Sequence, residues 1–145
     1  MFACHCPKTK ELKEKQITEY ENSECVFIGE IINIDIEKRT FEIKVIESFK
    51  GSEIGVIYNG NLNSSCGPRI RTKGKWLMYG NFYNSNTFTP NECGLSRSFK
   101  KPEFGHYKIL KPKSYAEMEY WDFILKIAKK ELDKEIQILR KKATE

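Results

Sequence analysis

The chain has 145 residues, of which 39% are hydrophobic, and 25 basic against 20 acidic residues give a formal net charge of +5. This length fits one domain with a modest core. No run of 18 apolar residues occurs, which excludes a membrane-spanning helix, and the basic excess is too evenly spread to indicate nucleic-acid binding by itself.

A short amphipathic helix is predicted for residues 8–21. Leu12, Ile17 and Tyr20 recur near helical spacing there, and the positions between them are mostly charged. Pro7 suits the position just outside a helix start. We therefore expect one face of this helix to pack on the protein and the other to face solvent.

A set of five or so short strands is predicted to follow this helix. These strands span residues 25–34, 40–46, 55–58, 76–79, 82–83 and 87–89, the last two forming a hairpin. The first strand is rich in β-branched residues and should be largely buried, while the second alternates apolar and polar side chains. Residues 59–68, crowded with Asn, Ser and Gly around Cys66, are predicted as a loop.

The C-terminal part is predicted as a connector, residues 100–113, and a long amphipathic helix, residues 114–142. Ser114 and Glu117 have the spacing of a capping box. The apolar stripe of this helix consists of Met118, Trp121, Leu125, Ala128, Leu132, Ile136 and Leu139. We expect the stripe to pack across the β region, with a coiled-coil or partner surface as the alternative, and we assign Trp76 and Trp121 to the core.

These elements predict a mainly β protein with flanking helices. A closed sheet of about five strands, with one helix before it and one after it, corresponds to an OB-like five-stranded β-barrel with helical additions. The expected organisation is a barrel over residues 4–99, the connector, and the C-terminal helix packed on the same domain.

The five cysteines are widely spread, at Cys4, Cys6, Cys25, Cys66 and Cys93. Two cysteines one residue apart point in opposite directions and can tie the N-terminal segment to two distant parts of the fold. The absence of a C-x-x-C pair gives no support to a zinc ribbon or a thioredoxin-like site, and the wide spread favours an oxidising compartment. An odd number leaves at least one thiol unpaired or modified.

The order of several motifs resembles the netrin-like domain, specifically the N-terminal domain of the tissue inhibitors of metalloproteinases. A Cys-x-Cys-Pro motif at residues 4–7 is followed by Ser65, Cys66 and Gly67 in a loop and by Cys93 after the last strand. Short sequence motifs at residues 26–29, 41–51 and 76–80 are similar to motifs of the family and occur in the same order along the chain. The resemblance covers residues 4–99, and the abundance of Ile, Lys, Asn and Glu hints at a microbial version.

The resemblance implies two disulfides, Cys4–Cys66 and Cys6–Cys93. Cys25 matches no bridging cysteine of the family, so a buried free thiol is expected there. The sequence departs from the family in having no counterpart of the third bridge of the animal inhibitors. Pro7 also follows Cys6 one residue sooner than in those proteins.

The function that the resemblance implies is inhibition of a zinc metalloproteinase. The α-amino group and carbonyl of Cys4 would chelate the zinc of the partner, and His5, bulkier than the residue usual in the family, would enter its specificity pocket. The contact ridge would comprise Cys4, His5, Cys6, Pro7, Ser64, Ser65 and Cys66. Chelation requires a cut after Ala3, because an amide nitrogen cannot donate to a metal as an amine does.

We expect a monomeric binding protein that is not an enzyme and holds no cofactor, secreted or placed in the cell envelope, in the periplasm or on the outer membrane surface. Two histidines, His5 and His106, without a recognisable nucleophile argue against catalysis. The partner would be a protein rather than a nucleic acid.

Three alternatives stay open. Residues 1–4 resemble either the end of a signal peptide or a lipobox, and a lipid on Cys4 would make the domain an envelope adaptor or structural protein. An OB-like domain could also bind glycans or single-stranded nucleic acid, for which Trp76 and the basic residues of segment 69–75 are the nearest cluster. Four cysteines and His5 could hold a metal, although none has the short spacing of zinc ligands.

Overall fold

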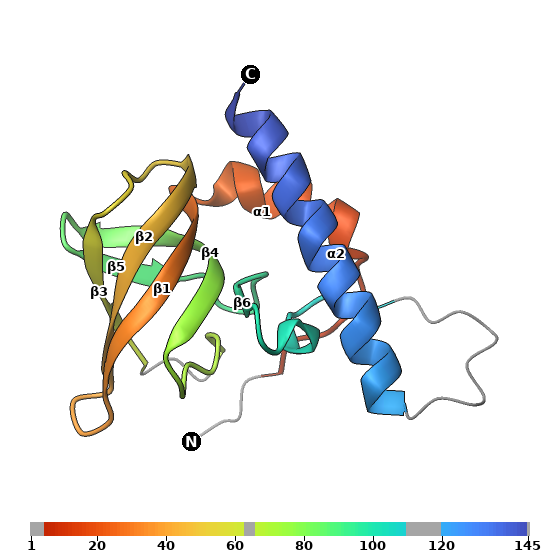
Figure 1. The fold of residues 1–145 in the computed structure, drawn as a ribbon, viewed down its shortest axis with the longest axis horizontal. Coiled ribbons are helices and arrows are strands. Elements are labelled where there is room, and N and C mark those ends of the chain that lie inside the picture. The colour runs from red at the N-terminus through yellow and green to blue at the C-terminus, as the bar shows by residue number, and fades with distance from the viewer. Residues whose placement is uncertain (1–4, 63–65, 110–119, 145) are drawn as a thin grey trace.

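The computed structural model describes residues 5–62, 66–109 and 120–144. In these residues a six-stranded sheet is preceded by a short helix and followed by a long one, which confirms a mainly β fold with two flanking helices (Figure 1). The elements are α1 (Leu12–Asn22), β1 (Cys25–Asp35), β2 (Thr40–Lys50), β3 (Ile57–Asn61), β4 (Gly74–Asn84), β5 (Thr87–Pro90), β6 (Arg97–Ser98), the 3-10 helix η1 (Pro102–Phe104) and α2 (Tyr120–Ala143).

Five of the strands are linked in a ring by backbone pairing. β1 pairs antiparallel with both β2 and β4, β2 pairs antiparallel with β3, β3 pairs parallel with β5, and β5 returns antiparallel to β4. The cycle β1–β2–β3–β5–β4 therefore closes on β1. The short strand β6 adds to β4 beside this ring.

The strands bury side chains on both faces, which explains the continuous apolar run at the start of β1. Phe27 and Ile31 join a strand cluster with buried side chains of β2, β3, β4 and β5. Val26 and Ile28, which point the opposite way, join a helix-facing cluster that includes Leu12 of α1 and three side chains of α2. Alternation along a strand sends neighbouring side chains to opposite faces, so both faces of β1 must be apolar.

Both helices lie on the same side of the strand ring (Figure 1). The buried positions of α2 are Ile124, Ala128, Leu132, Glu135, Ile136 and Leu139. The prediction that Trp121 belongs to the core is wrong, because its side chain is 68% exposed and Ile124 is buried in this part of the helix instead. The predicted helix start at Ser114 lies outside the described residues.

The predicted strands at 76–79 and 82–83 form one continuous strand, β4. A glycine at position 80 allows this, because a Cβ there would lie 2.3 Å from the carbonyl oxygen of Thr89 in the paired strand β5. The third strand begins at Ile57 rather than at Gly55, whose φ of 90° places it in a turn. Neither β6 nor η1 was predicted.

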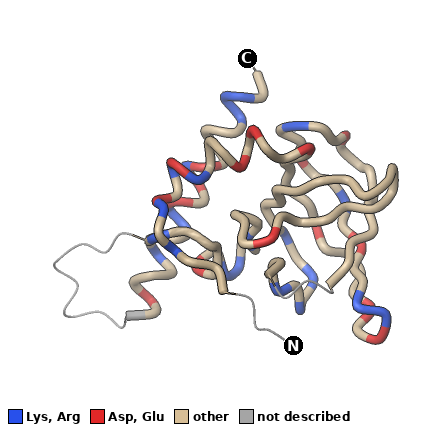
Figure 2. The backbone as a smooth tube through the Cα atoms, turned by 180° about the vertical axis from the view of Figure 1, so that it is seen from behind, with Lys and Arg blue, Asp and Glu red and all other residues tan. Residues whose placement is uncertain are grey.

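Basic and acidic residues are interspersed along α2 and around the β1–β2 turn (Figure 2). This distribution agrees with the charge pattern of the sequence. Among the described residues, no helix combines the length and the apolar character that crossing a membrane requires.

Candidate binding ridge at the N-terminal disulfide

A disulfide between Cys6 and Cys93 holds the N-terminal segment against the end of the β region. The two Cα atoms are 5.4 Å apart and the residues are 87 positions apart in the sequence. This bridge confirms the predicted Cys6–Cys93 pairing. On either side of Cys6, His5 and Pro7 are exposed, so the segment carries accessible side chains next to a covalent anchor.

Cys66 lies next to the Cys6–Cys93 disulfide. Its sulfur and those of Cys6 and Cys93 all lie within 4.8 Å of one another, and the backbone N–H of Cys93 donates to the carbonyl of Cys66 at 2.8 Å. The structure thus brings Cys66 beside the disulfide of the N-terminal segment. Of the predicted ridge, Cys4, Ser64 and Ser65 lie outside the described residues, and the pairing of Cys4 with Cys66 stays a prediction.

The backbone at Cys93 has an unusual conformation that sets the direction of its side chain. Its φ of 50° lies in the left-handed region, which residues with a Cβ rarely adopt. The carbonyl of Cys93 accepts a hydrogen bond from Lys15 Nζ on α1, which also donates to the carbonyl of His106. Burial lowers the pKa of Lys15 and that of the half-buried His106. Helix α1 therefore fixes the anchor point of the disulfide.

The chain between the ridge and α1 is also tied down. The backbone N–H of Lys108 donates to the carbonyl of Lys10 at 2.7 Å, and Glu11 forms an isolated parallel bridge with Lys108. The segment is thus held covalently at Cys6 and by backbone pairing four residues later. A segment held in this way loses little conformational entropy when it binds a partner.

A buried carboxylate shapes the chain on both sides of Cys93. Oε2 of Glu19 accepts the backbone N–H of Leu95 at 2.8 Å and the side-chain amide of Asn91 at 3.3 Å. The same amide donates to the hydroxyl of Ser23 at 2.9 Å. Burial raises the pKa of Glu19. These contacts make α1 the support of the segment that carries the disulfide.

Behind this segment lies a buried cluster of polar side chains that joins α2 to the sheet. Arg97 of β6 forms an ion pair with Glu135 of α2, and both side chains are fully buried. The hydroxyl of Tyr79 donates to the second carboxylate oxygen of Glu135 at 2.7 Å. The guanidinium group of Arg97 also donates to the carbonyl of Leu95 at 2.9 Å and lies 5.0 Å from the ring centre of Tyr107. Burial and the neighbouring carboxylate raise the pKa of Tyr79.

This cluster was not predicted from the sequence. One signal for it was present, since Glu135 falls between Leu132 and Leu139 in the apolar stripe, where a charged residue needs a buried partner. No pattern pointed to Arg97, because a two-residue strand is too short to show a period.

The three neighbouring sulfurs at the ridge are close enough to hold a metal ion as thiolates. Two of them, however, are joined in the Cys6–Cys93 disulfide, and a disulfide sulfur does not act as a thiolate ligand. In this oxidised form the group is a covalent clamp.

Cys25 carries a free thiol at the start of β1. Its side chain is buried, and its sulfur lies 3.5 Å from the carbonyl oxygen of Gly80. Burial raises the pKa of this thiol to about 12. The residue therefore belongs to the core and takes no part in the ridge.

The basic and aromatic cluster after Cys66 does not present its aromatic ring. Arg69, Arg71, Lys73 and Lys75 are exposed, but Trp76 is only 8% exposed and packs in the strand cluster. Because base stacking requires an open ring face, Trp76 cannot serve as a stacking platform.

The chain matches no protein-family model and no curated protein. Its likeness to the netrin-like domain therefore depends on the order of the motifs and on the cysteine positions.

Proposed function

We propose that this chain is a secreted or envelope-located netrin-like module that binds a protein partner through its clamped N-terminal ridge. More specifically, the ridge inhibits a zinc metalloproteinase once this chain has been cleaved after Ala3. The observation that carries the proposal is the Cys6–Cys93 disulfide, which holds the exposed side chains of His5 and Pro7 beside the loop of Cys66.

The strand pairing supports the fold part of the proposal. The cycle β1–β2–β3–β5–β4 is the arrangement that a five-stranded OB-like barrel requires, with the ends of the strands available to carry binding loops. A rigid ring gives the ridge a firm base. Cys66 precedes β4 of this ring, and Cys6 precedes α1, which leads into β1.

The physical advantage of the clamp is preorganisation. Ordering a free terminus on binding would cost roughly 1–2 kcal/mol in conformational entropy for each backbone residue that becomes fixed. The disulfide, the Lys108–Lys10 hydrogen bond and the two hydrogen bonds of Lys15 have already fixed this segment before a partner arrives. More of the contact energy then appears as affinity.

The proposed chemistry uses an open coordination position on the zinc of the partner. A terminal amine titrates near pH 8, so a useful fraction is neutral at physiological pH and can donate its lone pair. Together with the carbonyl of Cys4, it would displace the water that the protease uses for hydrolysis. His5 would then point into a wide specificity pocket.

The test compares two forms of the disulfide-bonded protein that differ by a single residue. One begins at Cys4 and the other begins at Ala3, so that the nitrogen of Cys4 is an amide. A panel of zinc endopeptidases is assayed with a fluorogenic peptide. The proposal expects inhibition by the Cys4 form and a loss of at least about a hundredfold, or 2.7 kcal/mol, in the Ala3 form. Equal potency of the two forms, or no inhibition by either, would contradict inhibition by chelation.

Mass spectrometry of the protein from its native source tests the state of Cys4. An unmodified Cys4 as the first residue agrees with the inhibitor. A diacylglyceryl group on Cys4 would instead establish a lipid-anchored envelope protein and refute chelation by the terminal amine.

A further inference from the structure

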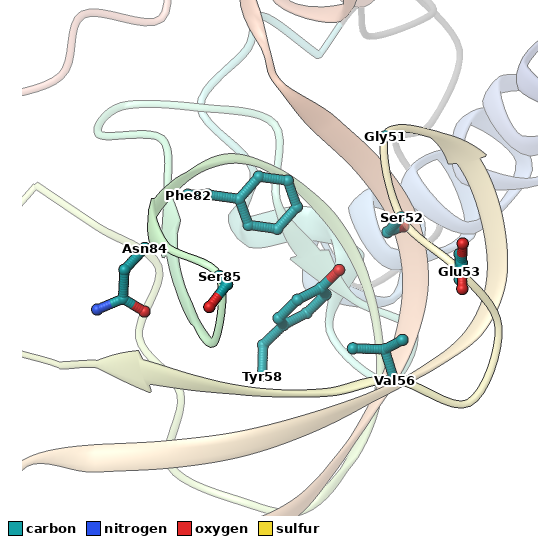
Figure 3. A pocket seen from close by; sticks show the side chains of 8 residues that line it. All are labelled: Gly51, Ser52, Glu53, Val56, Tyr58, Phe82, Asn84 and Ser85. Atoms are coloured by element: carbon teal, nitrogen blue, oxygen red, sulfur yellow. The ribbon is translucent and has the colours of Figure 1, made fainter.

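A surface depression of about 410 Å³ lies between the β2–β3 loop and the β4–β5 turn (Figure 3). Its principal side chains are Ser52, Glu53, Tyr58, Phe82, Asn84 and Ser85. The loop that carries Cys66 precedes the first residue of β4, whereas this depression lies at the last residues of that strand. The described ridge residues, His5, Cys6, Pro7 and Cys66, do not line the depression. The depression and the ridge are therefore separate sites.

One wall of the depression is aromatic and is held rigidly from behind. The half-buried ring of Phe82 lies 5.2 Å, centre to centre, from the ring of Tyr58. Tyr58 in turn packs at 6.0 Å from Phe27 and 6.3 Å from Phe88, both of which are fully buried. Phe82 thus lines the depression while packing against a nearly buried ring.

The polar groups of the depression include the hydroxyl of Tyr58. Tyr58 is only 5% exposed, and its hydroxyl makes no hydrogen bond to any residue in the described part of the chain. This hydroxyl points toward the space between Phe82 and Ser52 (Figure 3). The hydroxyl of Ser52 lies 3.0 Å from that of Ser48, and the carboxylate of Glu53 stands at the rim. Solvent reaches this hydroxyl, so a ligand in the depression can exchange the bond to water for a hydrogen bond of its own.

The composition of the lining excludes several ligand classes. Among the residues that the structure describes, the lining has one carboxylate and no Lys, Arg or His, so a phosphate or another anion would meet repulsion. A cage for a quaternary ammonium needs several open aromatic faces, whereas the ring of Tyr58 is almost fully buried and only Phe82 presents one. An open depression with hydroxyl and carboxylate groups also offers too little apolar surface for a lipid chain.

A sugar ring has the complementary chemistry, because one face carries C–H groups and its edge carries hydroxyls that both donate and accept. We propose that this depression is a subsite for one ring of a neutral oligosaccharide. The C–H face would stack on Phe82, and the ring hydroxyls would reach the Tyr58 hydroxyl, Ser52 and Glu53. This activity is independent of the ridge, and its success or failure leaves the proposed inhibition untouched.

The test uses the full disulfide-bonded chain, labelled with ¹⁵N and titrated separately with chitotriose, cellotriose and maltotriose. At least one trisaccharide should give saturable amide shifts in the β2–β3 loop and the β4–β5 turn. The Phe82→Leu variant should weaken that binding by about tenfold. The Tyr58→Phe variant, which keeps the core ring and removes only the hydroxyl, should weaken it by about threefold to tenfold. Tyr83→Phe is the matched control, because Tyr83 is 82% exposed and does not line the depression, and binding should stay unchanged.

Two results would overturn the proposal. The first is the absence of saturable shifts with all three trisaccharides, or shifts that Tyr58→Phe and Phe82→Leu leave unaffected. The second is binding of tetramethylammonium in the same loops that is lost in Glu53→Gln, because it would identify a cation site. Binding of a trisaccharide that survives Glu53→Gln supports the sugar subsite. Amide spectra of each variant establish that the fold is retained.

Discussion

Replacement of Glu135 by alanine should be among the most destabilising single changes in the described part of the molecule. The substitution removes the carboxylate paired with Arg97, whose side chain is fully buried. It also removes the acceptor of the Tyr79 hydroxyl. A buried charge that loses its partner costs about 3–5 kcal/mol, and an unsatisfied hydroxyl adds about 1–3 kcal/mol. We therefore expect a loss of at least about 4 kcal/mol in the free energy of unfolding.

A second ion pair between α2 and the sheet provides a matched control. Arg140 and Glu47 are joined at 2.8 Å, but their side chains are 57% and 33% exposed. Because solvent screens such a pair, Glu47→Ala should cost no more than about 1 kcal/mol. Both substitutions remove a carboxylate that bridges α2 and the sheet, so the contrast compares a buried polar cluster with an exposed ion pair.

The assay is urea unfolding followed by circular dichroism, with the disulfides intact. The double variant Arg97→Met with Glu135→Leu should recover most of the loss, because a buried ion pair contributes little net stability compared with apolar side chains of similar volume. Equal small losses for Glu135→Ala and Glu47→Ala would refute the reasoning. A double variant as unstable as Glu135→Ala would show that packing, rather than the uncompensated charge, causes the loss.

Three further predictions follow from single features. The thiol of Cys25, with its pKa raised to about 12 by burial, should resist iodoacetamide in the native protein and react after unfolding; alkylation of the native protein would contradict its burial. Replacing Cys6 and Cys93 by serine together should lower the unfolding free energy by up to about 4–5 kcal/mol in urea titrations, because the bridge closes a loop of 87 residues. Gly51→Ala should lower the melting temperature more than Gly55→Ala: both have left-handed backbone, with φ of 71° and 90°, but only at Gly51 would a Cβ lie 2.0 Å from a backbone oxygen.

The strands of the ring were predictable where they bury side chains regularly. Residues 40–45 alternate polar and apolar side chains, and Phe41, Ile43 and Val45 are buried in β2, although the alternation does not continue to the end of the strand at Lys50. The run after Cys25 is apolar on both faces because the strand cluster and the helix-facing cluster each take every second residue of it. A regular period in the sequence reflects a local environment that repeats along the strand.

The predictions failed where a distant contact decides the local structure. The predicted strands at 76–79 and 82–83 are one strand, and position 80 between them must be glycine because β5 approaches too closely for a Cβ. Trp121 has the spacing of the apolar stripe, yet α2 turns Ile124 inward and leaves Trp121 exposed. The pairing of Arg97 with Glu135 joins residues 38 positions apart, so no local pattern could indicate it.

Part of the candidate site could also be predicted from the sequence. The Cys6–Cys93 bridge followed from the resemblance, whereas the supports of the bridge did not. Lys15 and Glu19 look like ordinary surface residues of an amphipathic helix, and only the fold shows that they bind the backbone around Cys93. Their role depends on the way α1 meets a loop more than 70 residues away.

A nonreducing peptide map of the native protein tests the central claim most directly, namely that disulfides clamp the N-terminal segment to form the binding ridge. The account predicts one peptide pair linked through Cys6 and Cys93, a second linked through Cys4 and Cys66, and an unmodified Cys25. Free thiols at Cys6 and Cys93, or pairing of either with Cys25, would contradict it.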